Sequence, residues 1–438
     1  MRVPAALARA RAGLPPAIVK VLRTLAEAGK RSYIVGGAVR DVLLHRPREA
    51  NDFDLATPAT PEEVTALFRK VVPTGVEHGT VTVVDSGHAI EVTTFRGEGA
   101  YVDGRRPESV TFHGDLDADL ARRDFTMNAL AWDPLAPEFR DPFGGRADMA
   151  RRLVRAVGDP AERFREDGLR AMRAVRFAAQ FGYGLHPATR AAIPGALDVV
   201  RKVSIERVSE ELARLVVAPH AAQALALMRS TGLLGVVLPA VAARPRPELD
   251  HAVAVLRRVP PEVSLRFAAL LHTLRPDEAE RILLDLRRPR RESDAVAHVL
   301  RGHACRAAAR WSPLPVSDAE LRRWLSRVGL DRVDAFLALA DAEVRALPPS
   351  RAARARREVL DLKKSLAELG KSPPPLGARD LALDGRAVMA ILGAGPGPHV
   401  GEALRHLLDR VLEDPSLNVA PALERELLAW WAGRPRPA

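Results

Sequence analysis

Two aspartates in the N-terminal part of the chain, Asp52 and Asp54, have the spacing of a metal-binding carboxylate pair. They lie in a β-rich run, where side chains two residues apart leave the same face of a strand. Such a pair could share Mg²⁺ ions that bind a triphosphate, lower the pKa of an attacking hydroxyl and stabilise a leaving pyrophosphate. A solvated strand face or a turn is the more common origin of an isolated pair, so the neighbouring residues must decide.

A short strand that ends in Gly36 and Gly37 precedes the aspartates and runs into a helix start. Glycines at such a turn let backbone N–H groups approach phosphate oxygens, and the helix N-terminus adds a favourable dipole. Alone, a glycine pair indicates only a turn. With Arg40 behind it and the aspartates a short helix later, it predicts a triphosphate cradle beside a metal site.

A carboxylate and three guanidiniums recur at every third position in Asp167, Arg170, Arg173 and Arg176. At that spacing, neighbours touch along one winding stripe of a helix. Guanidinium donors and carboxylate acceptors together can hydrogen-bond the Watson–Crick edge of cytosine or adenine, so that protein replaces a nucleic-acid template. A solvated helix face with internal salt bridges is the alternative explanation of an isolated stripe.

These segments, in this order, resemble the motifs of the class II tRNA nucleotidyltransferases, the CCA-adding enzymes and bacterial poly(A) polymerases of the DNA polymerase beta superfamily. The matching segments are 36–41 with 52–54, 122–131, 166–177 and 203–212. The similarity runs from Tyr33 to about Pro239 and returns at 383–418. One departure is Gly168, where the family commonly has proline, and we expect it to cost local rigidity rather than chemistry.

The resemblance implies an enzyme that adds or repairs the 3′-terminal CCA of tRNA from CTP and ATP by a two-metal mechanism, with Mg²⁺ as cofactor. It implies that Asp52 and Asp54 are catalytic and bind the metal. The residues that it implies for nucleotide binding are Gly36, Gly37, Arg40, Arg123, Asp124, Asp167, Arg170, Arg173 and Arg176. Of these, Arg123 suits the triphosphate and Asp124 a ribose hydroxyl, with a buried ion pair as the alternative.

Several points stay open at this level. Arg122 is expected to be structural, and Glu91 is either a third carboxylate or an ordinary strand-face residue. The alternatives to CCA addition are an A-adding enzyme that works with a separate CC-adding partner, a poly(A) polymerase and a non-catalytic RNA-binding module. Residues 73–80 resemble the CCA-adding branch, the intact aspartates argue against a binding module, and the glycine-rich loop 96–107 resembles one used in switching from CTP to ATP.

The elements that must position these residues form an α+β fold. Short β-rich runs alternate with helical patterns up to Asp141, after which helical periodicity dominates; the runs are 33–35, 52–56, 79–85, 89–95 and 109–112. The expected parts are an N-terminal mixed β-sheet nucleotidyltransferase head (1–150), a helical neck with the base-recognition helix (151–215), a helical body (216–375) and a tRNA-binding helical tail (376–438).

The body contains a segment, Leu270 to Thr273, that resembles an eroded HD metal-phosphohydrolase motif with threonine in place of its aspartate. A neutral hydroxyl cannot replace a metal-bridging carboxylate. We therefore expect a scaffold without hydrolase activity, in which His251, His272 and His303 are packing residues.

Composition sets outer limits. At 438 residues the chain is long enough for several domains. No apolar run approaches the roughly 20 residues that a membrane-spanning helix needs, and the N-terminus lacks the apolar region of a signal peptide. We therefore expect a cytoplasmic protein. A formal charge of +11 suits a phosphate-rich partner, although a GC-rich coding sequence would also enrich arginine. The only cysteine, Cys305, excludes an internal disulfide and a cysteine-based zinc cluster. No protein partner is implied.

Overall fold

The computed structural model describes residues 3–46, 53–96, 101–102, 106–107, 115–136, 138–303, 315, 317–370 and 374–433. Asp52, most of the loop 96–107 and the expected strand 109–112 lie outside these residues. By its internal contacts the chain divides into two units, Met1–Ala243 and Arg244–Ala438, and each is described by itself. Among the described residues, the longest apolar helical stretches fall short of what a bilayer crossing requires.

A mixed seven-stranded sheet forms the centre of the first unit, in the order β3-β4-β5-β2-β1-β8-β9. Its strands are β1 (Tyr33–Val35), β2 (Asp54–Thr57), β3 (Val71–Gly75), β4 (Thr80–Asp85), β5 (His88–Thr94), β8 (Ala131–Asp133) and β9 (Glu138–Arg140). Strands β2 and β5 run parallel, and the other neighbouring pairs are antiparallel. The β-rich runs predicted β1, β2, β4 and β5, but not the exposed edge strand β3 or the short strands β8 and β9.

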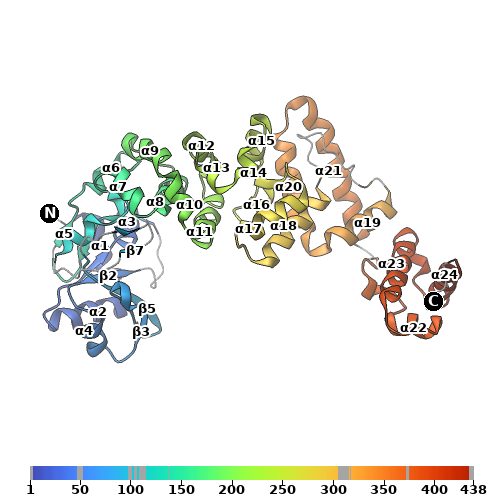
Figure 1. The fold of residues 1–438 in the computed structure, drawn as a ribbon, viewed down its shortest axis with the longest axis horizontal. Coiled ribbons are helices and arrows are strands. Elements are labelled where there is room, and N and C mark those ends of the chain that lie inside the picture. The colour runs from blue at the N-terminus through green and yellow to red at the C-terminus, as the bar shows by residue number, and fades with distance from the viewer. Residues whose placement is uncertain are drawn as a thin grey trace. The chain divides into compact units, whose positions relative to one another are not determined.

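Helices cover this sheet and continue beyond it, as Figure 1 shows. They are α1 (Ala5–Ala10), α2 (Pro16–Glu27), α3 (Gly37–Leu43), α4 (Pro61–Leu67), α5 (Leu116–Ala121), α6 (Gly145–Ala150), α7 (Pro160–Glu166), α8 (Leu169–Phe181), α9 (Pro187–Ala192), α10 (Leu197–Lys202), α11 (Ile205–Val216), α12 (Ala221–Thr231), α13 (Leu233–Val237) and α14 (Pro239–Ala242). Strand structure does not end at Asp141, since β10 (Leu153–Val154) pairs in parallel with β11 (Gly184–Leu185). A further two-residue pair joins β6 (Tyr101–Val102) to β7 (Arg106–Pro107).

The centre of the sheet is anchored by β1, whose three residues are all buried. One core cluster combines Tyr33 and Val35 of β1 with Leu116 and Leu120 of α5. Burial of aliphatic and aromatic side chains contributes roughly 1.5–3 kcal/mol each. This packing fixes β1 and therefore the glycine turn that follows it.

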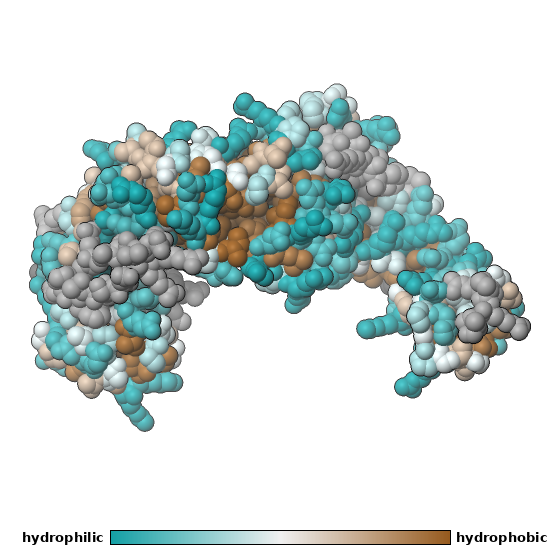
Figure 2. All heavy atoms as spheres, in the orientation of Figure 1, coloured by the Kyte–Doolittle hydropathy of each residue, from teal (hydrophilic) through white to brown (hydrophobic). Residues whose placement is uncertain are grey.

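The described residues of the second unit form helices and their connections, with no strand among them. Its helices are α15 (Arg246–Leu256), α16 (Val263–Leu271), α17 (Pro276–Asp285), α18 (Arg290–Gly302), α19 (Asp318–Val328), α20 (Val333–Ala346), α21 (Pro349–Leu369), α22 (Gly385–Leu392), α23 (Pro398–Glu413) and α24 (Ala420–Ala432). The breaks predicted at Pro245 and Pro289 fall where α15 and α18 begin. Hydrophilic side chains dominate the face of this unit drawn in Figure 2, because its helices turn their apolar stripes inward. The expected α+β class, with a sheet head followed by helices, is confirmed.

Candidate active site

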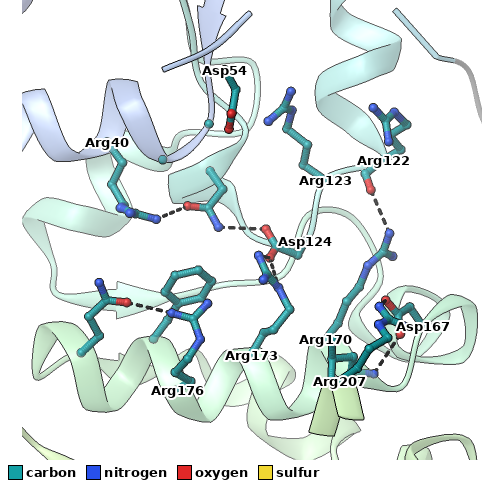
Figure 3. Close-up of a pocket in the computed structure, with 16 residues that line it drawn as sticks. Arg40, Asp54, Arg122, Arg123, Asp124, Asp167, Arg170, Arg173, Arg176 and Arg207 are labelled. Carbon is teal, nitrogen blue, oxygen red and sulfur yellow. Dashed lines mark hydrogen bonds and ion pairs between the residues drawn. The ribbon is translucent and has the colours of Figure 1, made fainter. Parts of the chain in front are cut away.

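A cavity of about 540 Å³ opens in the first unit between the sheet and helix α8. Each of the expected site residues that the structure describes lines this cavity; they are Gly36, Gly37, Arg40, Asp54, Arg123, Asp124, Asp167, Arg170, Arg173 and Arg176. Figure 3 shows how most of these side chains converge. Residues more than 100 positions apart in the sequence therefore share one site.

Asp54 stands at the exposed start of β2, whose next three residues are buried. In the parallel pairing of β2 and β5, its Cα lies in register with that of Glu91, which is also exposed. Residues in register on neighbouring strands project from the same face of a sheet. The fold therefore places a second carboxylate beside Asp54, while Asp52 lies outside the described residues.

The turn between β1 and α3 depends on Gly36. Its φ of +70° lies in the left-handed region, and a Cβ there would stand 2.8 Å from Nη1 of Arg123. Only glycine combines this backbone conformation with so close an approach of a guanidinium. The glycine turn therefore allows the Arg123 guanidinium to lie directly against it in the cavity.

Arg123 is held by Asp119, a fully buried carboxylate on α5. Nη2 of Arg123 donates to Asp119 over 3.1 Å, and Arg122 donates to the same side chain over 2.7 and 3.0 Å. Burial alone would raise the pKa of Asp119, but the charges of Arg123 and Arg122 outweigh it and the pKa lies below its ordinary value. Nε of Arg123 is buried and makes no hydrogen bond within the described residues, so this guanidinium has donor capacity left.

Arg40 is buried at 6% exposure and contacts protein with all three guanidinium nitrogens. It donates to Asp41 over 2.8 and 3.0 Å and to Oδ1 of Asn128 over 2.6 Å. Its guanidinium also lies 4.8 Å from the ring centre of Phe181. These contacts connect α3 to α8. In this structure the role of Arg40 is therefore to position the glycine turn.

Asp124 lies at the centre of the cavity (Figure 3). It accepts four hydrogen bonds. Oδ1 accepts from the backbone of Phe125 at 2.8 Å and from Asn128 at 2.9 Å. Oδ2 accepts from Arg173 at 2.6 and 2.8 Å. Burial raises the pKa of Asp124, but the charge of Arg173 and these hydrogen bonds bring the pKa below its ordinary value. The same pairing raises the pKa of Arg173.

Helix α8 carries the three arginines toward the cavity. Arg170 donates to Glu166 and to the backbone carbonyls of Arg163 and Arg122. Arg176 donates to Glu211 of α11 over 2.5 Å and stacks 3.9 Å from the ring centre of Phe177. Each guanidinium is therefore oriented by protein partners.

Asp167 does not lie on helix α8 with the arginines, as the three-residue spacing had suggested. It follows α7 in an extended conformation, and its Oδ1 accepts from the backbone N–H of Leu169 at 3.0 Å. Its Oδ2 accepts from Arg207 of α11 at 2.7 Å. Asp167 therefore both caps the first turn of α8 and faces the cavity, held from the neighbouring helix.

Sequence reasoning missed several residues that shape this site: Asn128, Glu166, Gln180, Arg207 and Glu211. Asn128 and Arg207 belong to the segments 122–131 and 203–212 that carried the resemblance. Both could have been predicted as site residues, because they are polar residues within motifs that matched the family.

Comparison with known proteins identifies the family to which the chain belongs. Residues 32–155 match the sequence model described as "Poly A polymerase head domain", and residues 182–244 match "Probable RNA and SrmB- binding site of polymerase A". The CCA-adding enzyme of Geobacillus stearothermophilus is 39% identical over 386 residues, which are 88% of this chain and 89% of that protein. The chain belongs to the CCA-adding enzyme family.

Members of this family are nucleotidyltransferases of class II, and two solved structures are similar to this one. The crystal structure of the Bacillus stearothermophilus CCA-adding enzyme in complex with CTP has a TM-score of 0.74 and 33% identity, covering 95% of this chain and 97% of that one. A tRNA nucleotidyltransferase complexed with a primer tRNA and an incoming ATP analog has a TM-score of 0.58 and 22% identity, covering 78% and 98%. The second likeness concerns the fold alone. This CCA-adding family member is an enzyme with a sheet head and helical remainder.

Proposed function

We propose that this nucleotidyltransferase adds or repairs the 3′-terminal CCA of tRNA, using CTP and ATP. The observation that carries the proposal is one cavity with three kinds of group around it: the Asp54 carboxylate, Arg123 at the glycine turn and the arginines of α8. These suit a metal, a triphosphate and a base respectively. The names of the relatives, CCA-adding enzymes, support the same activity.

The carboxylates of this site fit Mg²⁺, a hard cation that takes oxygen ligands. Asp54 is exposed at the cavity, Glu91 is in register beside it, and Asp52 precedes it by two residues. We propose that Asp52 and Asp54 hold the metal, with Glu91 as a third carboxylate. Bound there, the metal would supply positive charge that stabilises the triphosphate and the leaving pyrophosphate.

The protein's own groups would position the nucleotide. Nε of Arg123 and the adjoining Gly36 turn would hold triphosphate oxygens. A carboxylate has about four acceptor positions, and Asp124 uses four for Arg173, Asn128 and the backbone of Phe125. A ribose hydroxyl would therefore replace one of those donors, with Arg173 remaining as the counter-charge.

Asp167 and Arg170 are the proposed base-reading pair, with Arg173 and Arg176 completing the row. Arg170 makes three contacts within the described residues, which leaves other N–H donors of its five for a base edge. The Arg207 contact fixes the direction in which Asp167 presents its acceptors. An aspartate acceptor beside an arginine donor is complementary to the donor and acceptor edge of cytosine or adenine.

We keep the division into head (1–150), neck (151–215), body (216–375) and tail (376–438) as part of this proposal, with the tail contacting tRNA. A solved nucleotidyltransferase of the same fold holds a primer tRNA and an ATP analog, which supports tRNA and ATP as partners. The CTP complex of the more similar enzyme supports CTP. Backbone and phosphate contacts suit a chain with net charge +11.

The test uses three tRNA transcripts that end before CCA, after C and after CC, each incubated with CTP and ATP separately and together. Addition of two cytidines and then one adenosine supports the proposal. Adenosine added only to the CC end indicates an A-adding enzyme, and long adenosine tails on any end indicate a poly(A) polymerase. Binding without addition, in the presence of Mg²⁺, would leave a non-catalytic RNA-binding module. The Asp54→Ala variant serves as the inactive control.

A further inference from the structure

Three histidines and one glutamate meet inside the second unit, away from the nucleotidyltransferase cavity. His251 lies on α15, His272 follows α16, His303 follows α18 and Glu343 lies on α20. These helices pack on one another in the pairs α15 with α16, α15 with α20, α16 with α18 and α18 with α20. The four side chains therefore come from four helices of one bundle.

The donor atoms of this cluster are close together. One ligand atom from each of His251, His272 and Glu343 lies within 4.8 Å of the others. Nε2 of His303 is 3.1 Å from Oε2 of Glu343, and Nε2 of His251 is 3.9 Å from Oε1 of the same carboxylate. Ligand atoms around a tetrahedral zinc ion are about 3.4 Å apart, so the group of His251, His272 and Glu343 would have to contract around an ion. His303 would have to turn from its present contact with Glu343 to join them as a fourth ligand.

The cluster is shielded from water. The side chains of His303 and Glu343 are 3% and 1% exposed, His272 is 3% exposed and the His251 side chain 9%. Nε2 of each histidine is buried and makes no hydrogen bond by the geometry of the described residues, although His303 approaches Glu343 closely. Buried polar atoms normally have partners, since an unsatisfied one costs about 1–3 kcal/mol. For His251 and His303 the Glu343 carboxylate is the neighbouring group. Nε2 of His272, which makes no hydrogen bond among the described residues, is the atom that indicates a missing partner.

The tautomer of His272 suits a cation. Nδ1 of His272 lies 2.7 Å from the carbonyl oxygen of Ala269, which can only accept, so Nδ1 carries the hydrogen. Nε2 then has the lone pair, the arrangement typical of a metal-ligating histidine.

We propose that His251, His272, His303 and Glu343 bind one divalent transition-metal ion of the zinc class, which joins the four helices of the body. Three imidazole nitrogens and one carboxylate oxygen form a ligand set that suits Zn²⁺. A closed four-ligand shell is typical of a structural zinc site rather than a catalytic one. Thr273 adds no carboxylate, and its carbonyl accepts from Arg244 over 3.2 Å. The site is thus compatible with a scaffold that lacks hydrolase activity.

The first experiment measures metal content in full-length protein with any purification tag removed. A Cys305→Ser background excludes zinc held by the sole thiol. Elemental analysis should find about one zinc per chain, and His272→Ala should lower zinc affinity at least about 100-fold. Because that variant also removes buried side-chain volume, Glu343→Gln, which keeps the side-chain volume, is measured as well. His298→Gln on α18 is the matched control, since Nδ1 of His298 lies 2.7 Å from the carbonyl oxygen of Asp294, the same distance as between His272 and Ala269, but His298 lies outside the cluster.

The second experiment replaces zinc by Co²⁺ and adds thermal unfolding. After a chelator has removed its metal, the protein should gain the visible absorption of four-coordinate Co²⁺ and a higher Tm when Co²⁺ is added. The His298→Gln control should respond in the same way, whereas His272→Ala and Glu343→Gln should show neither change. The proposal is overturned if purified protein is metal-free and neither ion raises its Tm. It is also overturned if the cluster variants bind zinc as tightly as the control, because the metal would then sit elsewhere.

Discussion

Asp54 on β2 lies in register with Glu91 on the parallel strand β5, so two carboxylates share one face of the sheet, and Asp54 lines the cavity. Sequence spacing alone related Asp54 only to Asp52. The parallel pairing of β2 with β5 is the tertiary fact that relates it to Glu91. Because Glu91 is a second candidate ligand, the contributions of Asp54 and Glu91 can be tested separately by mutation.

We expect Asp54→Asn to abolish nucleotide addition and Glu91→Gln to slow it by about 10- to 100-fold. Loss of a metal-ligating carboxylate removes several kcal/mol of transition-state stabilisation, whereas a third carboxylate contributes less. Single-turnover addition of CTP to a tRNA transcript at saturating Mg²⁺ measures both, and a filter-binding assay should show tRNA affinity unchanged. Glu62→Gln, an exposed glutamate of α4, is the control. If Glu91→Gln behaves like that control, Glu91 is an ordinary strand-face residue.

Asp167→Ala should relax the choice of nucleotide more than it weakens triphosphate binding. A lost base contact costs about 1–3 kcal/mol of discrimination, which is measured as the ratio of kcat/KM for CTP over UTP. Arg207→Ala should reduce the same ratio less, because Arg207 acts through its 2.7 Å contact to Asp167. Arg201→Ala, an exposed arginine of the preceding helix α10, should leave the ratio unchanged. Unchanged rejection of UTP in Asp167→Ala would show that this aspartate serves the helix cap alone.

Sequence patterns predicted much of the fold and singled out residues that the structure brings to one cavity, but not how those residues are held. Short-range rules cover β1, the glycine turn and the arginine spacing of α8. They cannot supply the pairing of Asp124 with Arg173, 49 residues apart, or of Asp167 with Arg207, 40 residues apart. The same limit applies to the body, where four helices bring together histidines that had been interpreted one at a time as packing residues.

Gly168 has a structural reason that the comparison with proline did not suggest. A Cβ at this position would stand 2.6 Å from the backbone nitrogen of Val200 and 2.7 Å from the carbonyl carbon of Val199. Backbone atoms cannot rotate away, so we expect Gly168→Ala to destabilise the first unit by about 1–3 kcal/mol. Urea unfolding measures this, and Gly195→Ala is the control because a Cβ there meets nothing within 4 Å. Equal stability of the two variants would mean that helix α10 shifts at Val199 without a measurable cost in stability.

The pairing of Asp124 with Arg173 should make the first unit sensitive to acid. The fold lowers the pKa of Asp124, so its contribution to the free energy of unfolding is fully present above the ordinary aspartate pKa of about 3.9 and is lost as pH falls through the lower folded value. Asp124→Asn leaves Arg173 without that counter-charge and should cost about 1–3 kcal/mol at neutral pH.

Urea unfolding of wild type and Asp124→Asn from pH 7 down to about 3 tests this linkage. The difference in unfolding free energy should stay constant down to about pH 5 and then shrink, because the wild-type carboxylate becomes protonated while the amide does not titrate. Asp198→Asn, which removes an exposed partner of Arg201, should show no such convergence. A difference between wild type and Asp124→Asn that persists undiminished at the lowest pH would show that the asparagine disturbs packing, and that the ionised pair contributes nothing measurable.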